Sequence, residues 1–203
     1  MSSSSEEPAD LGRWSPVSPQ EAAAALSGFR RPWWIAGGVA IELFVGRRIR
    51  DHGDLDVEVL RIDQAELHGA LSDWDLRIAS RGRLTRWLEG AAVPGEANDI
   101  WCRDDPEGPW RFEIVLAASD GHRWLYRRDQ TVWRPLTEVG SGTSDGFPYL
   151  RPELVLLFKA KDTRPKDEQD LEAAVPLMDE GARAWLRHAL ETAHPGHPWI
   201  GRL

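Results

Sequence analysis

Two aspartates, at positions 54 and 56, carry the spacing in this sequence that is most informative about chemistry. Asp54 and Asp56 are separated by one residue in DLDVEVL, a segment that alternates as a β-strand. Alternate strand residues point to one face at a rise of about 3.3 Å per residue, so the two carboxylates are expected about 6 to 7 Å apart. Mg²⁺ is normally held by one or two carboxylates together with substrate phosphates. The pair therefore predicts a metal site that acts on phosphates.

A Gly-Gly pair precedes these aspartates and opens an apolar helical run. Gly37 and Gly38 have no Cβ, so backbone amides there can approach a triphosphate, and the next helix offers its free N–H groups to the anion. Arg50 is expected to hold a phosphate with two hydrogen bonds, while His52 either joins this nucleotide site or bonds its own loop. The alternative, two surface aspartates held by a turn, is disfavoured by the glycines upstream.

A third acidic residue is expected to complete the site. Glu113 is the first candidate, because a charged residue within the apolar strand FEIVL indicates a functional face, although it can also point outward on a half-exposed strand. Asp99, in DIWC, is the second candidate. Glu58 ranks below both, because four strand residues place it about 13 Å from Asp54.

The hydrophobic pattern predicts helices and strands in mixed order. Helices are expected at 19–29, 39–45 and 63–74, the last with a capping-box-like start at Asp63 and Glu66. From Arg151 onward the pattern is helical. Strands are expected at 33–36, 55–60, 76–79, 99–103, 112–117 and 124–127. The predicted class is α/β (α+β), a mixed β-sheet flanked by helices with a C-terminal helical segment.

The length of 203 residues suits one domain with a helical extension. We expect a disordered tail at 1–13, a core at 14–150 and a helical extension at 151–203 packed on the core. Neither a membrane-spanning run nor a signal peptide is recognisable, so we expect a cytoplasmic protein without a membrane partner. The single cysteine, Cys102, is expected on a buried strand.

The formal net charge of −8 argues against nucleic acid as the main partner, because duplex binding is usually driven by a cationic surface. A cationic partner fits this balance better, although an acidic surface also serves solubility alone. The eleven tryptophans are expected mainly in the core, with one or two near the site.

Three stretches together resemble the nucleotidyltransferase superfamily that includes DNA polymerase beta, and within it the small bacterial aminoglycoside and lincosamide nucleotidyltransferases. They are WWIAGGVAIELFVGRRIRDHGDLDVEVL, WRFEIVLAA and YLRPELVLLFKAKDTRPKDEQDLEAAVPLM. The resemblance implies a transferase with two Mg²⁺ ions and ATP as co-substrate, in which Asp54, Asp56 and Glu113 are the catalytic metal ligands.

The implied reaction moves a nucleoside monophosphate, AMP from ATP, to a hydroxyl of a small cationic acceptor such as an aminoglycoside, with release of pyrophosphate. The role implied would be antibiotic resistance. Two alternatives remain: nucleotidyl transfer to a protein partner, as in toxin and antitoxin pairs, or a nucleotide-binding module without catalysis.

The resemblance also bears on the lysine-rich segment FKAKDTRPKDEQD. By itself this segment reads as a solvated helical face. In the family the region closes over nucleotide and acceptor, so that Lys161 or Lys166 would neutralise the triphosphate and Asp167 or Asp170 would bind a cationic acceptor or act as base. Sequence leaves the acceptor, the base preference and the oligomeric state open.

Overall fold

The computed structural model describes residues 11–203, in which helices and strands alternate along the chain. The α-helices are α1 (Pro19–Ala25), α2 (Gly37–Val45), α3 (Gln64–Ala70), α4 (Pro152–Lys159), α5 (Pro165–Ala174) and α6 (Glu180–Ala193). The strands are β1 (Trp33–Ile35), β2 (Asp56–Leu60), β3 (Asp75–Ser80), β4 (Arg83–Arg86), β5 (Asp99–Arg103), β6 (Phe112–Ser119), β7 (Arg123–Leu125), β8 (Trp133–Pro135), β9 (Gly140–Gly142) and β10 (Pro148–Leu150). None of the helices in this part of the chain is long and apolar enough to cross a membrane.

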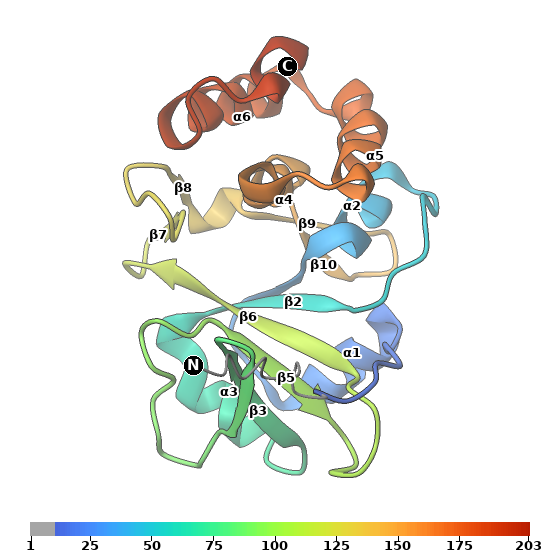
Figure 1. The fold of residues 1–203 in the computed structure, drawn as a ribbon, viewed down its shortest axis with the longest axis vertical. Coiled ribbons are helices and arrows are strands. Elements are labelled where there is room, and N and C mark those ends of the chain that lie inside the picture. The colour runs from blue at the N-terminus through green and yellow to red at the C-terminus, as the bar shows by residue number, and fades with distance from the viewer. Residues whose placement is uncertain (1–10) are drawn as a thin grey trace, which may run out of the picture.

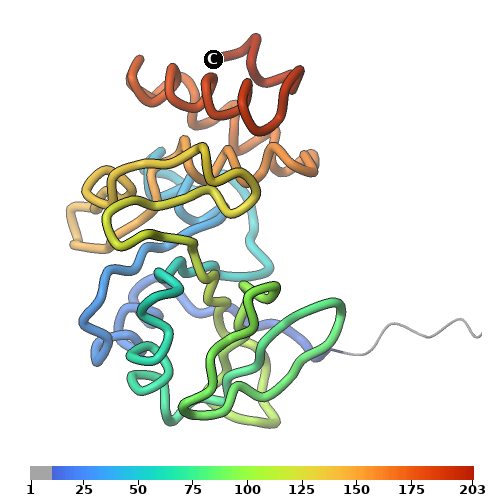
Figure 2. Tube along the Cα trace, turned by 90° about the vertical axis from the view of Figure 1, so that its left-hand side faces the viewer, coloured from blue at the N-terminus to red at the C-terminus, as the bar shows by residue number. Residues whose placement is uncertain are grey.

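The strands form one mixed sheet in the order β4-β3-β5-β6-β2-β1-β10-β9; off this path, β7 pairs with β6 and β8 pairs with β7. The pairs β2·β6 and β1·β10 are parallel, and the other pairs are antiparallel. Helices α2, α4, α5 and α6 lie on one side of β2 and β6, and α1 and α3 lie on the other (Figure 1). Viewed from the side, the C-terminal helices stack on the molecule opposite the green strands β3 to β5 (Figure 2). The predicted fold class is confirmed.

Local signals in the sequence set the helix ends. Ser18 and Glu21 form a capping box at the start of α1, and the α2 helix ends at Gly46, whose φ of 75° is left-handed. Helix α2 begins at Gly37, two residues before its predicted start, so the glycine pair lies in its first turn. The predicted capping box of α3 is wrong: Asp63 makes no capping hydrogen bond. Arg31 instead pairs with Asp63 and Glu66, which draws both carboxylates away from the helix end.

Strands β2 and β6 run through the centre of the molecule, and one face of the pair is fully buried. Val57 and Val59 of β2 are fully buried, and so are Phe112 and Ile114 of β6. Cys102, on the neighbouring β5, is buried as expected. Most of the predicted tail, residues 1–13, lies outside the described residues. Its last part lies against Trp110, whose indole N–H donates to the Leu11 carbonyl at 2.6 Å.

A buried network of ion pairs joins the C-terminal helices to the loop that precedes β2. Arg50 of this loop donates to both oxygens of Asp170 in α5, at 3.1 and 2.9 Å. Lys159, at the end of α4, lies 2.9 Å from Asp170 and 2.9 Å from Asp167. Both aspartate side chains are fully buried. The division into a core at 14–150 and an extension at 151–203 stays a prediction, and this network is one of the contacts that join the two parts.

Replacement of Asp170 by alanine tests how much this network stabilises the protein. Asp170→Ala leaves Arg50 and Lys159 without a shared buried partner, so we expect a loss of about 3–5 kcal/mol in the free energy of unfolding. Asp162→Ala removes an exposed partner of Lys161 and should cost about 1 kcal/mol or less. Urea denaturation measures both. Equal losses in the two variants would contradict a stabilising role of the network.

Candidate active site

A cavity of about 280 Å³ lies where β2, β5 and β6 meet the start of α2 and the end of α4. We call it the main cavity. Its lining combines four acidic residues, four basic residues and an apolar wall: Asp56, Glu58, Asp99, Glu113, Arg127, Arg128, Lys159, Arg164, Ala36, Gly37, Val115, Leu150, Val155 and Phe158. The formal charges of these acidic and basic groups cancel.

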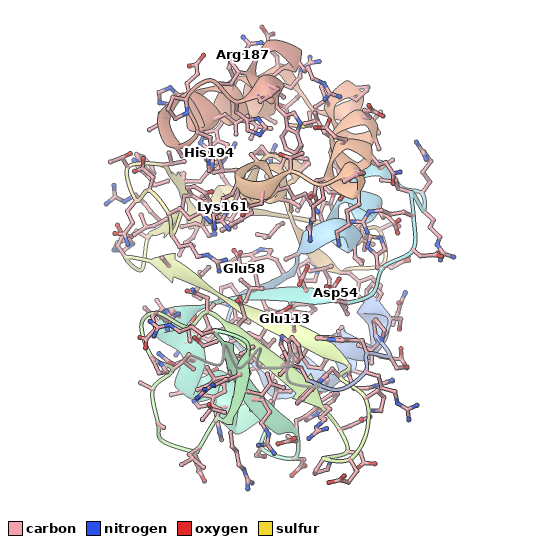
Figure 3. All side chains as sticks on the ribbon, viewed as in Figure 1. Asp54, Glu58, Glu113, Lys161, Arg187 and His194 are labelled. Atoms are coloured by element: carbon pink, nitrogen blue, oxygen red, sulfur yellow. The ribbon has the colours of Figure 1, made fainter. Side chains whose placement is uncertain are left out.

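The sheet register places two predicted site residues side by side. Asp56 of β2 pairs with Glu113 of the parallel strand β6, and the Glu113 N–H donates to the Leu55 carbonyl at 2.8 Å. On the other side of β6, Trp101 pairs with Glu113 and its indole N–H donates to Glu113 Oε1 at 3.1 Å. Asp54 lies just before β2, at the same end of the strand (Figure 3). The fold thus brings Asp54, Asp56 and Glu113 into one neighbourhood.

Burial and mutual repulsion make these carboxylates hard to ionise. Burial, followed by the charge of Asp54, raises the pKa of Asp56 to about 6. Burial, followed by the charges of Asp56 and Asp99, raises the pKa of Glu113 to about 8, although the Trp101 hydrogen bond acts in the opposite direction. A cation placed among these groups would favour their charged forms.

The donor set fits a hard divalent cation, because it consists of carboxylate oxygens beside a polar cavity. Within residues 11–203, no group of three or more His, Cys, Asp or Glu side chains is arranged as a ready metal site. Mg²⁺ usually keeps water and substrate phosphates in its shell, so two carboxylates with a bound triphosphate satisfy it. The three residues are therefore suited to a cation that arrives together with a nucleotide.

Gly37 permits the close approach of α2 to strand β2. Its φ is +60°, and a Cβ at this position would lie 1.9 Å from Asp56 Oδ2. Only glycine combines that backbone conformation with that contact. The first turn of α2 is thereby placed directly against the Asp56 carboxylate.

The other predicted nucleotide-binding residues near α2 have protein partners. A Cβ on Gly38 would lie 2.2 Å from Arg50 Nη2 and 2.5 Å from His52 Cε1, so this glycine makes room for the loop. Arg50 bonds Asp170, and His52 Nε2 lies 3.0 Å from Glu42 Oε1. None of Gly38, Arg50 and His52 lines the main cavity. Their assignment to the nucleotide stays a prediction.

A second hollow of about 240 Å³ shares four lining residues with the main cavity and is strongly basic. We call it the cationic hollow. It is lined by Arg128, Phe158, Lys159, Lys161, Asp162 and Arg164. Lys161 is half exposed here, with Asp162 at 3.5 Å. Four cations against one lining carboxylate suit a polyphosphate, although Lys159 and Arg164 are also paired with Asp167. The role of Lys161 stays a prediction.

Sequence reasoning missed several basic residues of the site and left the role of two aspartates open. Lys159 and Arg164 line both the main cavity and the cationic hollow, and Arg127 lines the main cavity. The lysine-rich segment FKAKDTRPKDEQD contains Lys159 and Arg164, but nothing in the sequence pattern marks Arg127. Asp167 and Asp170, considered as acceptor ligands or bases, are fully buried with Lys159 as a partner. Their burial leaves them no surface for an acceptor.

Glu58 and Asp99 also face the main cavity, one row further along the sheet than Asp56 and Glu113. Both pair with Val115, from opposite sides of β6. Glu58 is 2% exposed, and Trp124 Nε1 donates to its Oε1 at 2.8 Å. Whether Glu113 or Asp99 is the third acid stays open, but the register puts Glu113 next to Asp56.

The fold is nucleotidyltransferase-like, as comparisons with known proteins show. Residues 20–90, about a third of the chain, match the sequence model of the family described as aminoglycoside-2″-adenylyltransferase. The match contains α2, β2 and both aspartates, Asp54 and Asp56. A comparison with curated proteins gives no match.

Solved structures share the fold. The crystal structure of the lincosamide antibiotic adenylyltransferase LnuA, lincomycin-bound, matches with a TM-score of 0.55 at 14% identity, over 81% of this chain and 100% of that chain. ANT(2″)-Ia in complex with adenylyl-2″-tobramycin matches with a TM-score of 0.54 at 16% identity, over 85% and 95% of the two chains. The predicted resemblance is confirmed: the family model and these neighbours are those of antibiotic adenylyltransferases, which are nucleotidyltransferases.

Replacement of Gly37 by alanine tests the approach of α2 to Asp56. We expect Gly37→Ala to lower the melting temperature and to abolish Mg²⁺-ATP binding, because the new methyl group must displace the Asp56 carboxylate. Gly46→Ala is the matched control: its φ of +75° imposes a similar strain of about 1–2 kcal/mol, but its Cβ meets nothing within 4 Å. Calorimetric melting and nucleotide titration measure the two effects. If Gly37→Ala and Gly46→Ala bind Mg²⁺-ATP alike, the close approach of Gly37 to Asp56 is not required for nucleotide binding.

The pKa of Glu113 predicts how stability depends on pH without a divalent cation. Its folded pKa of about 8 exceeds the ordinary value of 4.5, so the folded state binds more protons than the unfolded state between these values. Stability in EDTA should therefore fall as pH rises from 5 to 8.5, and Glu113→Gln should flatten this fall. Mg²⁺ should raise the melting temperature more at pH 8.5 than at pH 5. If the stability of Glu113→Gln in EDTA fell with pH as steeply as that of the wild type, the raised pKa of Glu113 would not be the cause.

Proposed function

We propose that this protein is a Mg²⁺-dependent nucleotidyltransferase that moves AMP from ATP to a hydroxyl of a small cationic acceptor, with release of pyrophosphate. One observation carries the proposal: the half-buried carboxylates Asp56 and Glu113 lie side by side in a cavity that opens on a cationic hollow. Transfer of this kind requires metal-binding carboxylates next to a site for polyphosphate.

Asp54 and Asp56 would hold the cation with the triphosphate, and Glu113 would complete the set for a second ion. When bound, Mg²⁺ neutralises phosphate charge and favours the ionised acceptor hydroxyl. Lys159, Lys161 and Arg164 of the cationic hollow would bind the β- and γ-phosphates. The N-terminal turn of α2, held against Asp56 by Gly37, would present its free N–H groups to the same anion.

The transfer breaks one bond and forms another at the α-phosphorus. The acceptor oxygen attacks this atom, and the bond to the bridging oxygen of pyrophosphate breaks. The hydroxyl proton passes to a carboxylate of the site, for which Glu113 is our candidate. A cation bound beside Glu113 would keep its carboxylate ionised, so that it can accept this proton. Trp101 orients the Glu113 carboxylate through the hydrogen bond to Oε1.

An aminoglycoside is the leading acceptor class. The family model that matches residues 20–90 is described as aminoglycoside-2″-adenylyltransferase, and ANT(2″)-Ia was solved with adenylyl-2″-tobramycin. LnuA, with bound lincomycin, makes lincosamides the second class to test. The net charge of −8 agrees with a cationic acceptor.

Release of pyrophosphate from ATP and Mg²⁺ with a panel of aminoglycosides and lincosamides tests the proposal. We expect release with at least one aminoglycoside and a loss of at least about 100-fold in Asp54→Asn, since removal of a single charge-stabilising group typically costs this much. Asp51→Asn is the matched control, because Asp51 is exposed and lies three residues before Asp54. Release that is absent throughout the panel, or equal in both variants, would refute the proposed reaction.

A further inference from the structure

One part of the main cavity has no task in the proposed transfer. It contains Glu58 and Arg127, with Phe158, Leu150 and Val155 as an apolar wall. Figure 3 shows Glu58 on the side of β2 that faces helix α4, away from the Asp54 end of the strand. This part of the cavity is next to the metal-binding residues but does not include them.

Glu58 presents one oxygen to the cavity. The residue is 2% exposed, and its Oε1 accepts the Trp124 indole hydrogen bond at 2.8 Å. Among the described residues, its Oε2 has no hydrogen-bond partner and no cation within ion-pair distance. A buried carboxylate oxygen in this state is a strong acceptor for an N–H group of a ligand.

Arg127 supplies a donor in the same place. Its guanidinium carbon lies 5.3 Å from the centre of the Phe158 ring, and its Nη1 lies 3.8 Å from Asp99 Oδ1. Nη1 is buried and has no hydrogen-bond partner in the part of the chain that the structure describes. An N–H group left in this state lowers stability unless a ligand supplies an acceptor.

The charge of this region favours a neutral ligand over a polycation. Glu58 contributes one negative charge and Arg127 one positive charge, so the region has no net formal charge. Apolar side chains and a guanidinium stacked on Phe158 suit a flat ring. A purine with an amino group beside a ring nitrogen offers one donor and one acceptor on the same edge.

We propose that this part of the main cavity binds the nucleobase and selects adenine. Glu58 Oε2 accepts a hydrogen bond from the 6-amino group, and Arg127 donates to N7, the ring nitrogen on the same edge of the base. Hypoxanthine, which carries a carbonyl oxygen in place of this amino group, is repelled by Glu58. The inference rests on the proposed function, since it assumes that a nucleoside triphosphate enters the cavity.

Substitution of Glu58 by glutamine should change the preferred base. The Trp124 N–H requires an oxygen acceptor, so the amide of Glu58→Gln keeps its oxygen toward the indole and turns its NH₂ group into the cavity. An NH₂ group donates to the hypoxanthine oxygen and clashes with the adenine amino group. The variant is therefore expected to favour ITP over ATP relative to the wild type.

Calorimetric titration of ATP and of ITP with Mg²⁺ at pH 8.5, without an acceptor, measures this preference. The wild type should bind ATP at least about 10-fold more tightly than ITP, and Glu58→Gln should lower this ratio at least about 10-fold. Glu168→Gln is the matched control, because Glu168 Oε1 also accepts from an indole, that of Trp199 at 2.8 Å, but does not line the cavity. It should keep the wild-type ratio.

A second measurement needs no variant. Purine riboside triphosphate lacks the 6-amino group, and the wild type should bind it about 10-fold more weakly than ATP. The inference is overturned if the wild type binds ATP and purine riboside triphosphate equally, or if Glu58→Gln folds and keeps the wild-type ratio. The proposed function itself fails if the wild type binds none of these triphosphates.

Discussion

The parallel pairing of β2 with β6 is the constraint on which the candidate site depends. It sets Asp56 beside Glu113, and one row further it sets Glu58 beside Val115. Burial, and after it the charges of neighbouring carboxylates, raises the pKa of Asp56 to about 6 and that of Glu113 to about 8. The apolar faces of Val57, Val59 and Ile114 fix the register, since a shift by one residue would turn both carboxylates to the other face of the sheet.

The rest of the fold places the positive charge of Lys159 in the cavity with Asp56 and Glu113, but Lys159 forms its ion pairs with Asp167 and Asp170. Arg50 and Lys159 are engaged with Asp170, so the loop before β2 and the helices α4 and α5 are held in one arrangement. Lys159 also lines both the main cavity and the cationic hollow. A network that joins distant segments thus places a cation next to the carboxylates, and its two fully buried aspartates keep that cation in position.

Sequence patterns predicted the central elements well, because those elements have strong local signals. The alternation in DLDVEVL, the glycine pair and the apolar strand around Glu113 gave α2, β2 and β6. Short strands such as β4, β9 and β10 were missed, since strands of three or four residues are too short to show a period of their own. Arg50 was assigned to a phosphate, but its contact with Asp170 joins residues 120 positions apart, which no local spacing reveals. Glu58 was ranked by its distance to Asp54, whereas its position in the cavity follows from β6 and Trp124.

The structural carboxylates and those that face the cavity differ in the kind of hydrogen-bond donor that holds them. Burial would raise the pKa of Asp167, but hydrogen bonds from Arg164 and Lys159 lower it to about 2, so its charge is satisfied within the protein. Glu58 and Glu113 instead receive a hydrogen bond from an indole, which orients one oxygen without supplying a charge. Burial then dominates and raises the pKa of Glu58 to about 7 and that of Glu113 to about 8. A carboxylate held by an indole is fixed in direction and still lacks a positive partner. A cation or an N–H donor of a ligand would stabilise its charged form. The tryptophans of this chain therefore contribute to the site through their N–H groups as well as through their area.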